Sequence, residues 1–201
     1  AVKQPLAALL MRAALGVCDD SVRALPQTIV RTLTSYVEPV ERQHATDLLL
    51  GRPLSLAVPC LGPSATLLVH EPTSVVVRMQ QVAARGDRIG VRRMLDSLDA
   101  LRRGMRPGTM TLDAIVEEAW LADFSGDIPR AAARLDVALT ALPTLSTYIV
   151  TEPTLAASVG RAMAYRAELA ARLQDPSSAA LWASRVLTLW AHADRTLDPT
   201  L

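Results

Sequence analysis

The hydrophobic positions in residues 112–143 follow a helical period on both sides of one short polar turn. In the second half of this stretch, apolar side chains recur at alternating steps of three and four, which places them on one face of a 3.6-residue helix. They are Ile128, Ala131, Leu135, Ala138 and Leu142. Gly126 in the turn suits the left-handed conformation at a helix C-terminus, and Asp127 can cap the next helix. The pattern predicts two helices joined by a tight turn.

Prolines mark where other helices are expected to begin, because proline is tolerated in the first turn of a helix and excluded from its interior. Those that precede an apolar-periodic segment are Pro5, Pro26, Pro39, Pro72, Pro129, Pro153 and Pro176. In the N-terminal part we predict helices at 6–17, from 26 to about 36 and at 40–50, with a short helical turn at 21–25. Two further helix pairs are expected at 73–103 and 155–193.

Residues 52–71 interrupt this helical pattern with closely spaced prolines and glycines. Two apolar runs here, 54–58 and 66–69, are compatible with short strands or with a packed loop, and both alternatives stay open. We therefore divide the chain into an N-terminal helical part (1–51), an irregular connector (52–71) and a C-terminal series of helical repeats (72–201).

The composition favours an all-α fold. Half of the 201 residues are hydrophobic but only 3% are aromatic, so helix contacts must be made mainly by small and aliphatic side chains. The chain is long enough for one sizeable core or for a short stack of hairpins that bury each other in series. The formal net charge of +1 gives no reason to expect nucleic acid or an anionic membrane as partner.

The two cysteines, Cys18 and Cys60, match neither a zinc spacing nor a redox CxxC motif. We favour buried free thiols over the alternative of one disulfide, which requires an exported chain. No apolar run approaches the length of a membrane helix. The sequence does not determine the compartment, and we favour a soluble, bacterial-type cytoplasmic protein over an exported one. Because the sequence lacks an initiator methionine, we expect a processed chain or a piece of a longer one.

The stretch 112–143 resembles one unit of the tetratricopeptide repeat family, which consists of a helix, a Gly-Asp turn and a second helix closed by proline. The matching positions are Leu112 at the start, Gly126 and Asp127 at the turn, and Pro143 at the end. Ala131 and Ala138 take the two small positions of the second helix, where a neighbouring helix crosses closely. The first helix departs from the family pattern, with Glu118 where the family usually has leucine.

Two other segments resemble degraded units of the same family. The pair at 73–103 keeps Gly86 and Asp87 but has Val91 and Leu98 at the small positions, and the pair at 155–193 replaces the turn glycine with Gln174. The resemblance implies an all-α fold of antiparallel helical hairpins stacked as a short right-handed solenoid.

In that family, the first helix of each unit lines a concave face on which partner peptides lie. Carried to this chain, the best unit implies contact residues Asp113, Val116, Glu117, Trp120 and Asp123. In the third pair, a polar stripe at steps of four, three and four consists of Arg161, Tyr165, Glu168 and Arg172. Trp120 is either an exposed anchor for a partner or a core residue.

Catalytic motifs give no basis for an enzyme. There is no GxSxG sequence and no phosphate-binding glycine loop, and the histidines are scattered. Cys60 could act as a thiol nucleophile with His70 as its base. We favour the alternative in which Cys60 is a structural thiol and His70 is a surface imidazole. Neither a metal nor another cofactor is expected.

Charge is distributed in two opposite blocks. Eight arginines fall within residues 78–106, and residues 113–127 carry only acidic charges. If successive hairpins stack, mutual salt bridging on a solvated face is the favoured interpretation. A bipolar surface that orients a charged partner is the second, and a basic face for nucleic acid is the third.

These observations predict a non-enzymatic protein–protein interaction module, or a scaffold subunit of a larger assembly, that binds a protein or peptide in a helical-repeat groove. The alternative is a helical sensor or regulatory domain of a signalling or transcription-regulating protein.

Overall fold

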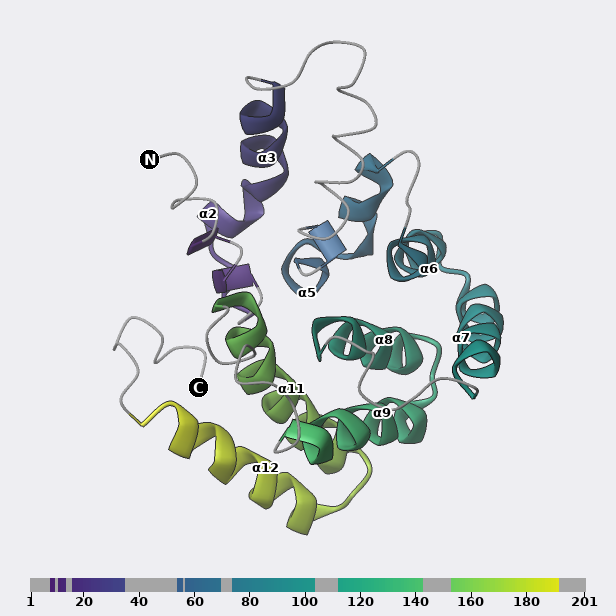
Figure 1. Cartoon of the computed structure of the whole chain (residues 1–201), viewed down its shortest axis with the longest axis vertical. Coiled ribbons are helices and arrows are strands. Elements are labelled where there is room, and N and C mark those ends of the chain that lie inside the picture. The colour runs from purple at the N-terminus through teal and green to yellow at the C-terminus, as the bar shows by residue number, and fades with distance from the viewer. Residues whose placement is uncertain are drawn as a thin grey trace. The chain divides into compact units, whose positions relative to one another are not determined.

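The computed structural model in Figure 1 describes residues 8–9, 11–13, 16–34, 54–55, 57–69, 74–103, 112–142 and 153–191. Regular structure within these ranges is helical, without any strand, in agreement with the predicted all-α class. The chain forms two compact units, residues 1–91 and 92–201, which divide inside helix α7 (Arg88–Arg102). None of the helices in the described ranges is both long and apolar enough to cross a membrane.

The first unit contains several short helices around one aliphatic core. They are α2 (Asp20–Arg23), α3 (Leu25–Thr34), α5 (Val58–Leu61), the 3₁₀ helix η1 (Pro63–Leu68) and α6 (Val75–Ala84). The buried side chains of this core are Ala13, Val22, Leu25, Ile29, Leu54, Ala57, Val69 and Val77. The predicted helix at 40–50 lies outside the described residues.

The segment that we divided off as a connector contributes to this core. Leu54, Ala57 and Val69 are each no more than 1% exposed and pack with residues of α2 and α3. The strand alternative for this segment is wrong, because the prolines here begin helical turns. Pro59 lies in the first turn of α5 and Pro63 in the first turn of η1, where the missing N–H needs no partner.

Cys18 and Cys60 are joined in a disulfide, with their Cα atoms 4.9 Å apart. The expectation of free thiols is therefore wrong, and the disulfide alternative describes the structure. The bond links the segment before α2 to α5 across 42 positions of sequence. The spacing of the two cysteines in the sequence could not predict this bond, because they come together only when α2 and α5 pack against each other.

Replacing Cys18 and Cys60 with serine is expected to lower the free energy of unfolding by about 2–4 kcal/mol, because the cross-link restricts the unfolded chain. Urea unfolding followed by circular dichroism measures the difference. A thiol titration of the denatured wild-type protein should find no free thiol until a reductant is added. Two reactive thiols before reduction would contradict the disulfide.

The second unit is built from two pairs of helices and the C-terminal part of α7. The pairs are α8 (Leu112–Phe124) with α9 (Ile128–Ala141), and α11 (Pro153–Arg172) with α12 (Pro176–Leu189). Within each pair the two helices pack together, and α11 also contacts both α8 and α9. In Figure 1 these helices run from teal to yellow. The predicted helix pairs are confirmed to within a few residues at each end.

The turn chemistry expected from the sequence is present at both pairs. The Asp127 carboxylate accepts a hydrogen bond from the backbone N–H of Arg130 at 3.2 Å, and the backbone of Gly126 has a φ of 86°. Asp175 caps α12 in the same way by accepting from the Ser178 N–H at 3.0 Å. Gln174 takes the positive φ that glycine has in the other turn, 60°, which is unusual for a residue with a side chain.

The predicted apolar face of α9 is buried in its middle, whereas Ile128 and Leu142 at its two ends are half-buried. Ala131 and Leu135 are fully buried and Ala138 is 4% exposed, so the small side chains lie where neighbouring helices approach. On α7, Leu95 is fully buried, whereas Leu101 in the last turn is 73% exposed.

Helices α11 and α12 approach closely where the ring of Trp190 lies against Gly160. A Cβ atom built on Gly160 would lie 2.7 Å from the Trp190 Nε1 atom and within 3.2 Å of two ring carbons. A glycine inside a helix is normally unfavourable relative to alanine. Here its missing side chain makes room for the indole at the end of α12.

Gly160→Ala should therefore change the free energy of unfolding in opposite directions in two backgrounds. In the wild-type protein the clash should outweigh the better helix propensity and destabilise by about 1 kcal/mol. In a Trp190→Ala background the clash is gone, so the same substitution should stabilise by about 1 kcal/mol. Urea titrations of the four proteins measure both values, and stabilisation in the wild-type background would refute the contact.

Candidate functional site

Helices α8 and α11 pack against each other, so most of the predicted partner-binding residues lie on neighbouring helices. We call seven of these residues the α8–α11 strip: Glu117, Trp120, Asp123, Arg161, Tyr165, Glu168 and Arg172. Asp113 lies in the first turn of α8, but its side chain lies outside the described part of the structure. Val116 is 5% exposed, so it belongs to the core and the expectation that it contacts a partner is wrong. It turns inward with Ile115 and Ala119 on the apolar face.

Asp123 is the centre of the α8–α11 strip. Its carboxylate accepts hydrogen bonds from both terminal nitrogens of Arg172, each at 2.6 Å, and from the Tyr165 hydroxyl at 2.9 Å. Arg172 also lies 3.8 Å from Glu168. The structure thus brings together four residues that the sequence assigned to two separate stripes.

These contacts shift the acid–base properties of the strip. Burial raises the pKa of Asp123, but the hydrogen bonds from Arg172 and Tyr165 outweigh burial and hold the pKa below its ordinary value. Burial, followed by the hydrogen bond to Asp123, raises the pKa of Tyr165. The pair therefore holds Asp123 ionised and Tyr165 protonated at neutral pH.

Farther along the strip, Arg161 and Glu117 are close enough to interact electrostatically. Burial lowers the pKa of Arg161 to about 10, and the attraction of Glu117 opposes that shift. Trp120 is half-buried and stacks on Phe124, with ring centroids 5.7 Å apart. Trp120 is thus neither a fully buried core residue nor a freely exposed anchor.

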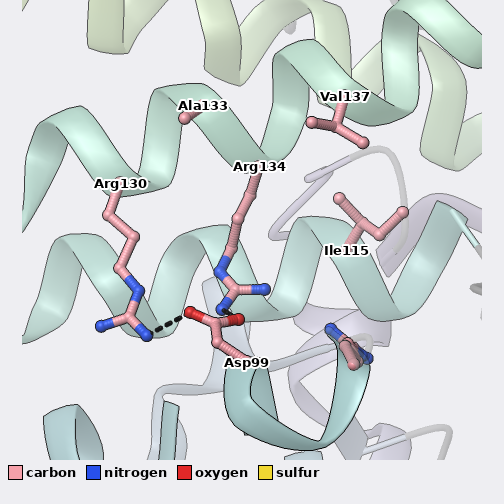
Figure 2. A pocket seen from close by; sticks show the side chains of 7 residues that line it. Asp99, Ile115, Arg130, Ala133, Arg134 and Val137 are labelled. Atoms are coloured by element: carbon pink, nitrogen blue, oxygen red, sulfur yellow. Dashed lines mark hydrogen bonds and ion pairs between the residues drawn. The ribbon is translucent and has the colours of Figure 1, made fainter. Parts of the chain in front are cut away.

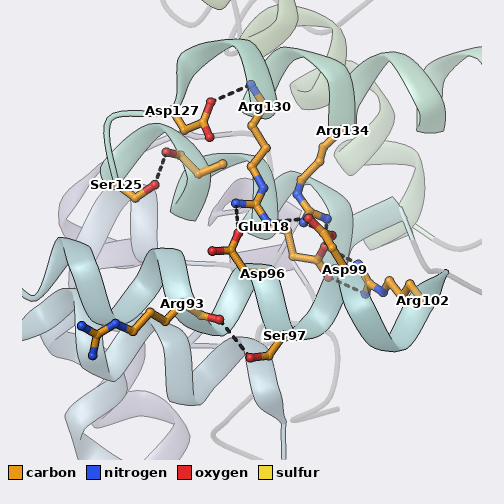
Figure 3. Close-up of polar contacts among 11 residues, drawn as sticks. Arg93, Asp96, Ser97, Asp99, Arg102, Glu118, Ser125, Asp127, Arg130 and Arg134 are labelled. Carbon is orange, nitrogen blue, oxygen red and sulfur yellow. Dashed lines mark hydrogen bonds and ion pairs between the residues drawn. The ribbon is translucent and has the colours of Figure 1, made fainter.

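A second group of charged residues joins α7, α8 and α9 (Figure 3). We call it the arginine cluster, and its members are Arg102, Arg130, Arg134, Asp96, Asp99 and Glu118. Its innermost member, Glu118, is fully buried. The Glu118 carboxylate accepts from Arg102 at 2.5 and 2.6 Å and from Arg134 at 2.7 Å. A buried carboxylate held by two guanidiniums ties α8 to both α7 and α9.

Asp99 continues the arginine cluster toward the surface. Its two oxygens accept hydrogen bonds from Arg130 and Arg134, and Arg130 also donates to Asp96 at 2.7 Å. Burial raises the pKa of Asp99, but the two arginines outweigh burial and hold the pKa below its ordinary value. Nearby, Arg92 donates to the Ser125 carbonyl at 3.1 Å. Every one of these contacts joins α7 to the α8–α9 pair.

Sequence reasoning anticipated salt bridges between the arginine-rich and acidic blocks, and Arg102–Glu118 is one of them. It placed them on a solvated face, whereas the Glu118 side chain is completely buried. The missed signal was that Glu118 lies three residues after Ile115 and one before Ala119, on the apolar face of α8. A carboxylate on a core face requires a cationic partner.

A pocket of about 330 Å³ opens beside the arginine cluster (Figure 2). Its lining combines charged and apolar side chains: Asp99, Arg102, Ile115, Arg130, Ala133, Arg134 and Val137. The volume lies at the lower end of the range typical of small-molecule sites, about 300–1,000 Å³. Its residues come from α7, α8 and α9, and none belongs to the α8–α11 strip.

Among the described residues we find neither a cluster of metal-ligating side chains nor a free thiol to act as a nucleophile. No group of three or more His, Cys, Asp or Glu side chains able to hold a metal ion occurs in the described ranges. The Cys60 thiol considered as a nucleophile is engaged in the disulfide, and its proposed base, His70, lies outside the described residues. No protein-family model, curated protein or solved structure matches this chain.

Glu118→Gln and Asp96→Asn should destabilise the protein to very different extents. The first leaves Arg102 and Arg134 without their buried counter-charge and is expected to lower the free energy of unfolding by about 3–5 kcal/mol. The second changes a carboxylate that is 62% exposed and is expected to cost less than about 1 kcal/mol. Urea titration compares the two, and effects of equal size would contradict the central position of Glu118.

Proposed function

We propose that this chain is a non-enzymatic protein-interaction module that binds a segment of another protein along the α8–α11 strip. The observation that supports it most directly is the meeting of Asp123 with Tyr165 and Arg172, residues more than 40 positions away in sequence. That meeting joins charged and aromatic side chains of two packed helices. A flat helical bundle face without such residues would have favoured a purely structural role.

We further propose that the second unit is a tetratricopeptide-like stack of helical hairpins. Support comes from the paired helices α8–α9 and α11–α12, the capping aspartates Asp127 and Asp175, and the buried alanines Ala131 and Ala138. In such a stack the first helices of successive units lie side by side, as α8 and α11 do. Adjacent first helices form the surface on which a peptide can lie.

The strip has features that favour a protein partner. Trp120 and Phe124 form a stacked, half-buried aromatic pair, which is the type of residue that supplies binding energy at protein interfaces. Beside them, Asp123 holds Tyr165 and Arg172 in fixed positions, so less side-chain freedom is lost when a partner binds. The charges on the strip are mixed, which suits a segment that presents both signs around an apolar residue.

A helical sensor or regulatory domain is the second candidate, and one observation favours it. The pocket beside the arginine cluster lies between three helices and is lined by both charged and apolar side chains. This is the arrangement of a small-molecule site rather than a peptide groove.

Trp120→Ala combined with Tyr165→Ala should weaken capture of partner proteins from a lysate of the native host, measured by quantitative mass spectrometry. The double variant removes the aromatic surface and the hydroxyl that orients Asp123. Its helical circular dichroism should persist. A matched control is Leu181→Ala with Leu187→Ala, two exposed apolar residues of α12 in the same unit. Equal capture by the wild type and the strip variant would count against the proposal.

A further inference from the structure

Helix α12 has an exposed side that carries no charge. The helix packs on α11, and its buried side chains are Trp182 and Val186. On the opposite side, exposed residues at steps of three and four share one face, which we call the α12 outer face. Its members are Ala180, Leu181, Ser184, Leu187 and Thr188. A surface helix normally presents charged side chains on the side away from the core, and this one does not.

The two leucines of the α12 outer face are open to water. Leu181 is 47% exposed and Leu187 is 58% exposed. Single exposed apolar residues are ordinary on protein surfaces, but these two lie on one helix face among small and uncharged neighbours. Covering both of them with another apolar surface would be favourable, because it removes their hydrocarbon from water.

The two hydroxyl groups of the α12 outer face already have acceptors within the helix. Ser184 donates to the Leu181 carbonyl at 2.9 Å, and Thr188 donates to the Ser184 carbonyl at 2.9 Å. A hydroxyl that is bonded to its own helix can be covered by apolar atoms without leaving its donor unsatisfied. The whole face can therefore be buried against another surface at little polar cost.

Charge decides which partner suits this face. Arg185 is the only charged residue within α12, and it projects about 100° away from its neighbour Ser184 at the centre of the face. Its guanidinium carbon lies 4.4 Å from the centroid of the Trp182 ring, which belongs to the buried side. A strongly charged partner would find no opposite charge on the outer face to orient it. Two copies of the face can meet without placing like charges at the centre of the contact, so a second copy of this chain is the occupant that fits.

We propose that the α12 outer face is the contact surface of a symmetric, antiparallel homodimer centred on Ser184. A two-fold axis at this residue places Leu181 opposite Leu187 of the second copy, and Ala180 opposite Thr188. The small side chains of Ala180 and Ser184 allow the two helices to approach closely, and the four leucines form the apolar part of the contact. One helix pair of about 21 Å is smaller than a stable interface of about 1,200–2,000 Å², so the dimer is a weak one.

This inference does not rest on the proposed function, because the α12 outer face shares no residue with the α8–α11 strip. The Trp120→Ala, Tyr165→Ala variant should form the dimer as the wild type does. Leu181→Ala with Leu187→Ala should lose the dimer and keep its capture of partners that bind the strip. The two proposals can therefore fail separately.

Sedimentation equilibrium of the full chain measures the self-association. We expect a reversible monomer–dimer equilibrium with a dissociation constant of about 100 µM, which does not weaken when NaCl is raised because no ion pair crosses the contact. Leu187→Glu should weaken it at least about tenfold, since its carboxylate would lie against Leu181 of the second copy. Val137→Glu makes the same kind of change at an exposed apolar residue of α9 and should associate like the wild type.

Two results would overturn the proposal. A wild-type chain that stays monomeric up to about 1 mM would assign the α12 outer face to a different protein, because a contact weaker than this is not a specific interface. Association that is unchanged in Leu187→Glu, or lost equally in Val137→Glu, would place the contact elsewhere on the chain.

Cross-linking of introduced thiols by diamide tests the register. Both native cysteines are in the disulfide, so Ser184→Cys adds the only free thiol, and its two copies should cross-link readily because they meet on the two-fold axis. Leu181→Cys should cross-link more slowly, since its two copies lie about 9 Å apart along the helices. Ser97→Cys is the matched control, an exposed serine of α7 whose hydroxyl also donates to its own helix, and should cross-link only by random collision. Equal rates for Ser184→Cys and Ser97→Cys, or a faster rate for Leu181→Cys, would overturn the two-fold contact at Ser184.

Discussion

The second unit depends on a carboxylate that has no access to water. Glu118 lies on the core face of α8, and a buried carboxylate without a partner would be strongly unfavourable. Its charge is matched by Arg102 from α7 and Arg134 from α9, so the three helices can take only positions in which both guanidiniums reach it. Such a buried group adds little net stability compared with an apolar side chain, but it excludes arrangements in which it would be unpaired.

Helix α8 supports two groups of polar contacts, one around Glu118 and one around Asp123. One side of α8 carries Glu118 and supports the arginine cluster with its pocket, while Asp123 supports the strip with α11. Because both depend on α8, a ligand in the pocket and a partner on the strip would act on the same structural element. The bidentate pairs at Arg102–Glu118 and Arg172–Asp123 have the geometry that gives arginine its directional preference.

The first unit is held together by different means. Its helices are short, so an aliphatic core around Leu25, Ile29 and Leu54 is supplemented by the covalent link between Cys18 and Cys60. Short helices contribute little stability of their own, since the first turn of a helix is its most costly part. A disulfide compensates by restricting the unfolded chain rather than by adding contacts.

The sequence by itself determined the local structure: the all-α class, the bounds of α8, α9, α11 and α12, the capped turns, and the burial of Ala131 and Ala138. These features depend on residues a few positions apart, whose spacing is visible in the chain. Only the tertiary structure decided which distant residues meet, including Glu118 with Arg102 and Arg134, Asp123 with Tyr165 and Arg172, and Cys18 with Cys60. Those pairings depend on how helices cross in space, and the same helical periodicity is compatible with many crossings.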